Sequence, residues 1–270
     1  MLSIVIPVLN EWHYTKQCLE GLRKTVSPET CIIVIDNGST DQTPACLAKE
    51  RDLRVIRNEI NRGCAAAWNQ GVRAFPAEWT VILNNDVLLP SGWLNGLLCF
   101  AEKNKLDVVS PGMREGELNY DLEKYAQEFV QKMKGTFRPG TANGVCFAVR
   151  HDVFDTIGFF DENFRIGQFE DTDFFLRARR AGFRLATTGE SFIHHFGSVT
   201  QNAVRKEETA LRYEAENRAY FRKKWNLTAP RRFVMRLKTK AAGFYRSHTE
   251  RRKFGHSLSE KWIDGQLQYH

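Results

Sequence analysis

The chain has 270 residues, of which 42% are hydrophobic and 12% aromatic, with 39 Lys and Arg against 32 Asp and Glu. This composition is typical of a folded globular protein and excludes a disordered chain, a fibrous repeat and a small disulfide-stapled domain. The charge is uneven, because residues 201–270 carry a net charge of +10 and residues 1–200 a net charge of −3. We therefore expect a main domain over residues 1–200 and a basic helical extension over residues 201–270.

The N-terminus and the cysteines bear on where the protein works. The first residues, MLSIVIP, lack a basic segment before their apolar run and predict a strand rather than a signal peptide. No apolar run reaches the roughly 18 to 20 residues that cross a bilayer, so we expect a cytoplasmic protein. The six cysteines form no C-x-x-C pair and lie among apolar or small residues, which predicts buried free thiols rather than zinc or disulfide sites.

Strands and helices alternate in the first part of the chain. Apolar runs predict strands at residues 3–9, 31–36, 54–57 and 79–84. The segments between them predict helices at residues 15–24, 43–50 and 64–75. Repeated strand–helix–strand units predict an α/β fold, with a mostly parallel central sheet flanked by helices.

The later elements are less regular. Helices are expected at residues 92–104, 152–157, 170–181 and 203–225, and short strands at residues 107–110, 143–149, 183–187 and 191–195. Residues 112–140 show no strong apolar period and are interpreted as a variable insertion. Pro230 marks a break before the basic tail.

Polar residues follow each of the first four predicted strands. They are, in chain order, Asn10 with Glu11, residues 36–41 (DNGSTD), residues 61–63 (NRG) and residues 84–86 (NND). Because ligands of an open parallel sheet bind at the carboxyl ends of its strands, we expect the four clusters to converge on one crevice. Ordinary turn chemistry is the alternative explanation for any single cluster.

The clusters favour a nucleotide with a phosphate leaving group. The chain has neither a G-x-G-x-x-G nor a G-x-x-x-x-G-K-[ST] motif, so its binding groups are carboxylates and amides, which can bond a base and a ribose. Asp86, at a strand end with few other ligands, suits Mg²⁺ or Mn²⁺ that takes further ligands from a diphosphate.

Two later segments carry further candidates. Glu170, Asp171 and Asp173 open a predicted helix, whose dipole favours ionised carboxylates; a general base is one interpretation and a helix cap the other. His195 precedes a Phe-Gly-Ser loop that can return over a diphosphate, which suits a metal ligand or a phosphate contact. A structural role is the alternative for His195 and the favoured one for His194.

Together these segments resemble the family 2 glycosyltransferases, and most closely the bacterial rhamnosyltransferase-like members that build surface polysaccharides. The resemblance covers about residues 1–200 in the family's order. The segments that carry it are residues 3–11 (SIVIPVLNE), 34–41 (VIDNGSTD), 61–63 (NRG), 69–71 (NQG), 83–86 (LNND), 158–162 (GFFDE), 170–173 (EDTD) with Arg177 and Gly182, and 195–197 (HFG).

The resemblance implies a GT-A fold and an inverting transfer from a UDP- or dTDP-linked sugar to a saccharide or lipid-linked saccharide in cell-surface glycan synthesis, such as lipopolysaccharide, O-antigen or capsule. It places Asp171 as the catalytic base and Asp86 at the end of the family's D-x-D motif, whose first aspartate is replaced by Asn84. A Mg²⁺ or Mn²⁺ ion held by Asp86, with His195, would neutralise the leaving diphosphate. The residues expected around the nucleotide are Pro7, Asn10, Glu11, Asp36, Asn61, Arg62, Asn69, Asn84 and Asn85.

The tail combines an apolar face with basic residues. Apolar residues recur at helical spacing over residues 231–246, at Phe233, Val234, Leu237, Ala241, Phe244 and Tyr245. Such a helix can lie on an anionic membrane, which suits a lipid-linked acceptor and a peripheral position on the inner face of the cell membrane. Packing on the main domain and a homodimer contact are the alternatives.

Two other functions are alternatives to a transferase. A nucleic-acid-binding protein would use the basic tail, but the positive charge is confined to one end and the crevice carboxylates repel a phosphate backbone, so no nucleic-acid partner is expected. A nucleotidyltransferase would need a glycine- and arginine-rich phosphate loop near the N-terminus, and the sequence has none. No pattern in the sequence identifies the sugar, the acceptor or the oligomeric state.

Overall fold

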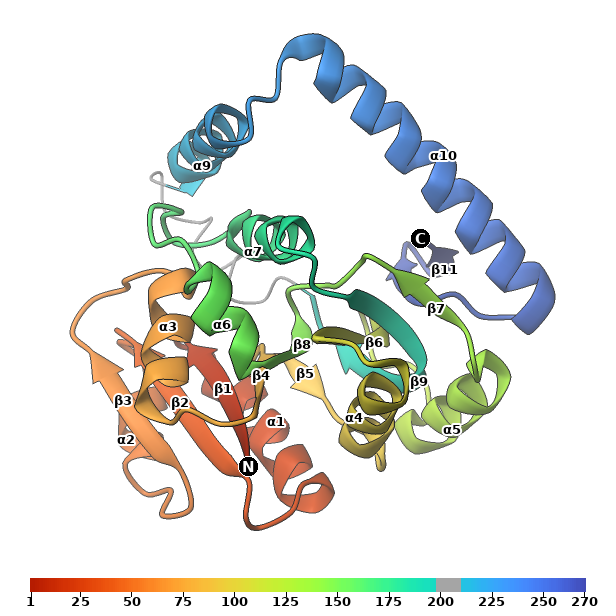
Figure 1. The fold of residues 1–270 in the computed structure, drawn as a ribbon. Coiled ribbons are helices and arrows are strands. Elements are labelled where there is room, and N and C mark those ends of the chain that lie inside the picture. Colours follow the sequence, from red (N-terminus) through yellow and green to blue (C-terminus); the bar gives the residue numbers. More distant parts are fainter. Residues whose placement is uncertain (198–209) are drawn as a thin grey trace.

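The computed structural model describes residues 1–197 and 210–270. Four parallel strands in the order β3–β2–β1–β4 form one half of its sheet, with β3 at the edge. They are β1 (Leu2–Val8), β2 (Cys31–Asn37), β3 (Arg54–Asn58) and β4 (Trp79–Leu83). Most residues of β1, β2 and β4 are buried because helices cover both faces of the sheet (Figure 1). The predicted α/β class with a mostly parallel central sheet is confirmed.

The other half of the sheet has mixed strand directions. β8 (Cys146–Arg150) runs antiparallel to both β4 and β6 (Val108–Glu115), and β6 pairs in parallel with β9 (Leu185–His195). β5 (Val87–Leu88) and β7 (Phe137–Pro139) pair antiparallel with β9. β5 begins directly after Asp86, so its pairing with the end of β9 joins two of the predicted site segments.

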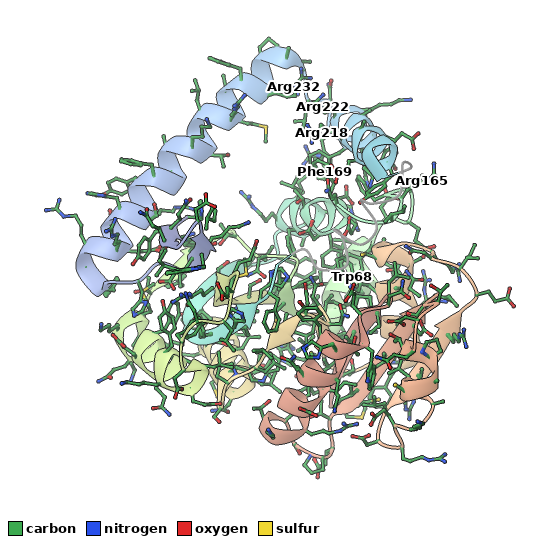
Figure 2. The ribbon with its side chains drawn as sticks, turned by 180° about the vertical axis from the view of Figure 1, so that it is seen from behind. Trp68, Arg165, Phe169, Arg218, Arg222 and Arg232 are labelled. Carbon is green, nitrogen blue, oxygen red and sulfur yellow. The ribbon has the colours of Figure 1, made fainter. Side chains whose placement is uncertain are left out.

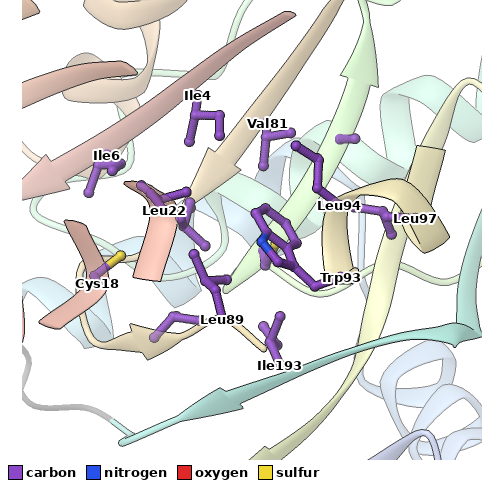
Figure 3. Close-up of a cluster of buried hydrophobic side chains, with 14 of the residues drawn as sticks. Ile4, Ile6, Cys18, Leu22, Val81, Leu89, Trp93, Leu94, Leu97 and Ile193 are labelled. Carbon is purple, nitrogen blue, oxygen red and sulfur yellow. The ribbon is translucent and has the colours of Figure 1, made fainter. Parts of the chain in front are cut away.

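One face of the sheet is covered by α1 (Trp12–Thr25) and α4 (Trp93–Asn104). In α1, the buried residues Cys18 and Leu19 lie one helical turn before the buried Leu22, so the three form one stripe that faces the strands. Figure 3 shows this apolar cluster, in which helix residues meet Ile4, Ile6 and Val81 of the sheet.

The opposite face is covered by α3 (Cys64–Ala74), α6 (His151–Ile157) and α7 (Glu170–Arg180). Their buried side chains include a group of aromatic rings, with Phe160 and Phe174 at a centroid distance of 4.4 Å. The short α2 (Thr43–Leu47) connects β2 and β3. The carboxyl ends of β1, β2 and β4 lie near the start of α7.

Residues 112–140, interpreted as a variable insertion, form regular elements that the sequence did not predict. The segment contains the end of β6, then α5 (Leu122–Met133) and β7. The buried residues of α5, Ala126, Phe129 and Met133, form a narrow stripe that packs against Phe192 of β9. The stripe is easily missed because polar residues fill the rest of the helix.

Two smaller predictions also need correction. The two strands expected at residues 183–187 and 191–195 are one strand, β9, with a register shift between Thr188 and Phe192. All six cysteines are free, as expected, but only Cys18 and Cys146 are buried, and Cys99 is exposed.

The described part of the extension begins with two helices. α9 (Ala210–Lys224) matches the end of the helix predicted over residues 203–225; residues 203–209 lie outside the described residues. Pro230 stands in the first turn of α10 (Ala229–Phe254), which confirms the predicted break. Figure 1 shows α10 as a long rod that stands away from the sheet and connects α9 to the C-terminal strands.

The last residues return to the sheet, which the sequence did not predict. β10 (Ser259–Ile263) and β11 (Gln266–Tyr269) form a hairpin, and β10 pairs in parallel with β6. The expectation of a wholly helical extension is therefore wrong for these residues. The large apolar side chains between Phe233 and Tyr245 of α10 are exposed and do not pack on the main domain, whereas Phe254 at the end of the helix packs against the cluster around Phe129.

Candidate active site

A cavity of about 440 Å³ lies where β1, β2 and β4 end. Its walls come from these strand ends, from the loop and first turn that open α7, and from Tyr213 of α9. The structure thus brings seven of the predicted site residues to one surface: Pro7, Asn61, Asn84, Asn85, Asp86, Asp171 and His195. The remaining five predicted residues lie outside this wall.

Asn10 connects two of the strand-end loops. Its side-chain oxygen accepts hydrogen bonds from the backbone N–H groups of Thr40 and Asp41 at 2.8 and 3.2 Å, and its own N–H donates to the Ser39 hydroxyl at 2.7 Å. Asn10 and Glu11 both have a φ of 57°, a conformation that Asn tolerates better than most residues. Asn10 therefore fixes the loop after β1 against the loop after β2.

Asp36 is buried at the end of β2 and lies beside Arg57. Its Oδ1 accepts a hydrogen bond from the Ser39 N–H at 2.9 Å. Its Oδ2 has no hydrogen-bond partner within the described part of the chain, although Arg57 Nε lies 3.5 Å away. The Asp36 side chain is only 1% exposed and is not among the residues that line the cavity.

Arg62 and Asn69 have different surroundings. The Arg62 backbone N–H donates to Asn37 Oδ1 at 3.1 Å, and its side chain is exposed. Asn69 is buried on α3, where its amide donates to the Phe160 carbonyl and to Glu162 and accepts from the Phe160 N–H, each within 2.9 Å. Asn69 therefore connects α3 to the segment before α7, behind the cavity wall.

The pairing of β5 with β9 brings Asp86 and His195 together. His195 Nε2 lies 3.2 Å from Asp86 Oδ1, and His195 Nδ1 lies 3.6 Å from Glu115 Oε2. Lys261 of β10 pairs with the other oxygen of Glu115 at 2.6 Å. Burial alone lowers the pKa of His195, but the Asp86 and Glu115 carboxylates outweigh burial and raise this pKa to about 9.

With His195 deprotonated, the donor set at this position fits a divalent cation that is bound together with a diphosphate. Both ring nitrogens of the buried His195 lack a hydrogen-bond partner among the residues described. Within residues 1–197 and 210–270, no cluster of three or more His, Cys, Asp or Glu side chains is arranged to hold a metal. One carboxylate and one imidazole leave most of a Mg²⁺ or Mn²⁺ coordination sphere to phosphate oxygens and water.

The three acidic residues at the start of α7 have separate surroundings. Glu170 and Asp171 both line the cavity, and burial raises the pKa of each carboxyl group; the Asp171 charge adds to the shift of Glu170. Asp173 is fully buried and bonds Arg177, Lys224 and the Trp225 indole at 2.8 to 2.9 Å. Asp173 therefore anchors α9, while Glu170 and Asp171 face the cavity.

Gly144 lets the Asp171 carboxylate lie against the backbone. A Cβ at position 144 would come within 2.8 Å of Asp171 Cγ and still closer to Oδ2. Only glycine leaves this space open. The Asp171 Oδ1 atom accepts hydrogen bonds from the N–H and hydroxyl of Thr172, at 2.6 and 3.2 Å.

Several wall residues were not expected from the sequence. Trp68 of α3 and residues 166–169 before α7 line the cavity, as does Tyr213, which lies beyond the predicted main domain. Figure 2 shows Phe169 between α9 and the part of the molecule that carries Trp68. The sequence marks Trp68 only as a helical apolar residue, and no local pattern places Tyr213 near the strand ends.

Comparison with known proteins identifies related chains. The family model described as glycosyl transferase family 2 matches residues 3–171. A pre-mycofactocin glycosyltransferase of Mycobacterium tuberculosis is 27% identical over 205 residues, which cover 72% of this chain and 42% of that protein. Glycosyltransferase GlyG of Streptococcus pneumoniae is 27% identical over 113 residues, 40% of this chain and 38% of that protein. The chain thus spans less than half the length of these two relatives.

Two solved structures share the fold. GalNAc-T7, crystallised with UDP, GalNAc and Mn²⁺, superposes with a TM-score of 0.59 at 17% identity, covering 72% of this chain and 43% of that one. S. aureus TarS 1–349 in complex with UDP-GlcNAc gives a TM-score of 0.56 at 19% identity, covering 72% of this chain and 57% of that one. The predicted GT-A fold is confirmed.

Proposed function

Because the chain belongs to glycosyl transferase family 2, we propose that it transfers a sugar from a nucleoside-diphosphate sugar to an acceptor hydroxyl, with inversion at the anomeric carbon. One observation carries the proposal: a single cavity holds both Asp171, whose pKa burial raises, and the Asp86–His195 pair. The first group can accept a proton, and the second can place positive charge beside a leaving diphosphate.

The proposed donor is UDP- or dTDP-linked. A pyrimidine of this kind presents an imide N–H, and the acceptor proposed for it is Asp36 Oδ2 at the end of β2, which accepts no hydrogen bond from the described residues and lies 3.5 Å from Arg57 Nε. GalNAc-T7 was solved with UDP and TarS with UDP-GlcNAc, which supports a pyrimidine nucleotide here. The other residues proposed to surround the nucleotide are Pro7, Asn10, Glu11, Asn61, Arg62, Asn69, Asn84 and Asn85.

In the proposed reaction, the acceptor oxygen attacks the anomeric carbon from the face opposite the nucleotide. A new C–O bond forms as the bond from that carbon to the diphosphate oxygen breaks, through an oxocarbenium-like transition state. Asp171 takes the proton of the acceptor hydroxyl, and its raised pKa makes it a stronger proton acceptor than an ordinary aspartate. A Mg²⁺ or Mn²⁺ ion held by Asp86 and His195 would supply charge stabilisation for the diphosphate.

We further propose a rhamnosyltransferase-like role in surface-glycan assembly, with a lipid-linked saccharide as acceptor. Residues 229–249 contain six Lys and Arg and no Asp or Glu, and the apolar side chains among them are exposed. This surface suits the anionic inner face of the cell membrane. No helix in the described parts of the chain is both long and apolar enough to span a membrane.

No observation favours the nucleic-acid-binding alternative. Glu170, Asp171 and Asp86 all line the cavity, and these carboxylates repel a phosphate backbone in the absence of a metal ion. The basic residues of α10 lie on a helix outside this cavity.

A thermal stability panel tests the donor assignment. UDP, dTDP, GDP and CDP, with and without Mn²⁺, are added at about 100 times Kd, where a ligand that binds only the folded state raises the melting temperature by roughly 5 °C. We expect a shift with UDP or dTDP that Mn²⁺ enlarges, and Asp86→Asn should remove only the Mn²⁺-dependent part. A shift with GDP alone would refute the pyrimidine assignment, and no shift with any of the four would refute the proposed function.

A further inference from the structure

The loop that leads into α7 is held in an unusual backbone conformation. Ile166, Gln168 and Phe169 line the cavity and have φ values of 61°, 78° and 76°. Residues other than glycine rarely adopt positive φ, and β-branched residues do so only when their surroundings impose it. Something outside the loop must therefore hold it.

Asn217 of α9 holds the loop through several hydrogen bonds to its backbone. Its side chain is only 1% exposed, and its Oδ1 accepts a hydrogen bond from the Arg165 N–H at 2.9 Å. Its Nδ2 donates to the carbonyls of Arg165 and Gly167 at 2.8 and 2.7 Å. One buried amide thus satisfies backbone donors and acceptors along the loop, much as a neighbouring strand would.

Further contacts with α9 and α3 also hold the loop. On the α9 side, Gln168 donates to Glu214 at 2.9 Å, and the rings of Phe169 and Phe221 lie 5.1 Å apart. On the α3 side, the Cys64 N–H donates to the Ile166 carbonyl at 2.8 Å. Figure 2 shows Phe169 directly beside α9.

The end of this loop sets the position of the first turn of α7. Phe169 is the residue before the helix, and its carbonyl accepts the Asp173 N–H at 2.8 Å. Glu170 and Asp171 follow immediately, so a shift of the loop moves the Asp171 carboxylate.

We propose that Asn217 is a positioning residue for Asp171: by holding residues 165–168, it sets where the carboxylate meets the acceptor hydroxyl. The inference rests on the proposed function, because it assigns the base role to Asp171. Since the family match ends at residue 171, this assigns α9, which lies beyond the matched segment, a part in the site.

The test compares Asn217→Ala with Tyr220→Phe as a matched control. Tyr220 also lies on α9, and its hydroxyl donates to Asp161 at 2.8 Å, so the control removes an α9 anchor without touching residues 165–168. Misplacement of a catalytic group by about 1 Å can cost about 100-fold in rate. We expect kcat of Asn217→Ala to fall by about that factor with the donor KM nearly unchanged, and kcat of the control to stay within about twofold of wild type. Asn217→Asp keeps the acceptor for Arg165 and should recover part of kcat.

Hydrogen exchange gives a second readout that does not depend on activity. Amides of residues 163–170 should exchange about tenfold faster in Asn217→Ala than in wild type or the control, because local opening becomes easier. Equal kcat in Asn217→Ala and the control, a loss confined to KM, or unchanged exchange would overturn the proposal; if Asn217→Ala does not fold, the same comparisons apply to Asn217→Asp. Absence of transfer by the wild type would instead refute the proposed function, and the exchange result would still decide whether Asn217 holds the loop.

Discussion

The Asp171 carboxylate occupies space that is open only because residue 144 is a glycine. A methyl group there would overlap the Asp171 carboxylate, so Gly144→Ala should push the carboxylate away from its position in the cavity. We expect kcat to fall by roughly 10- to 100-fold, because the base is displaced while the nucleotide contacts remain. Steady-state kinetics measures the change in kcat, and the nucleotide-induced shift in melting temperature should stay as in wild type.

Gly21→Ala is the matched control for that change. Its added methyl would lie 3.6 Å from Leu89, which is ordinary van der Waals contact, on a helix away from the cavity. Wild-type kcat in both variants would show that the Asp171 carboxylate is not needed where the structure places it.

Single residues were predictable from the sequence where they end strands. Asn84, Asn85 and Asp86 follow an apolar run, and the topology of a parallel sheet alone brings such residues to one edge. Gly144 and Asn217 were not predictable in this way, because their roles come from contacts with residues 27 and about 50 positions away along the chain. Nothing in the local pattern around either residue indicates its partner.

Among the elements, α10 exposes several large apolar side chains. Phe244 and Tyr245 are 74% and 72% exposed on a helix that has basic residues and no acidic residue before Glu250. We expect the protein to cosediment with vesicles that contain an anionic phospholipid, and less with purely neutral vesicles, since each Lys or Arg near an anionic surface contributes about 1 kcal/mol. High salt should weaken this binding.

The double substitution Phe244→Ser with Tyr245→Ser should lower binding to anionic vesicles by about tenfold or more, because it removes apolar area from the interface. Ile60→Ser serves as the control, since Ile60 is 72% exposed but lies outside α10. Equal binding to neutral and anionic vesicles, or no binding to either, would argue against a membrane-facing helix. A concentration-dependent dimer that the double substitution abolishes would favour the homodimer alternative.

The success of element prediction followed the strength of the apolar pattern. The strands β1, β2 and β4 are almost entirely apolar and were predicted closely. The helix α5 has only a narrow buried stripe, and β10 and the edge strand β11 are half-polar, so their patterns resemble those of loops. Strand pairing with β6, not local sequence, makes residues 259–263 a strand.

At the scale of the whole molecule, the extension returns to the main domain at several points. Lys224 pairs with Asp161, Lys261 with Glu115, and Arg138 bonds both oxygens of Glu250, at 2.9 and 2.6 Å. Glu115 also lies 3.6 Å from His195, so Lys261 of the C-terminal hairpin is separated from His195 by a single side chain. Residues beyond 200 therefore contribute both to the cavity wall and to the support of the candidate metal ligands.

The role of Asp171 is tested most directly by measuring sugar transfer with Asp171→Asn, using the donor that stabilises the wild type and following both nucleoside diphosphate release and glycosylated product. A general base contributes about 10²- to 10⁴-fold, so we expect kcat to fall within that range while donor binding, read from the melting temperature, stays unchanged. Asp152→Asn, which removes an exposed carboxylate from the first turn of α6, should keep wild-type activity. Full turnover by Asp171→Asn would contradict the assignment of the base and with it the proposed mechanism.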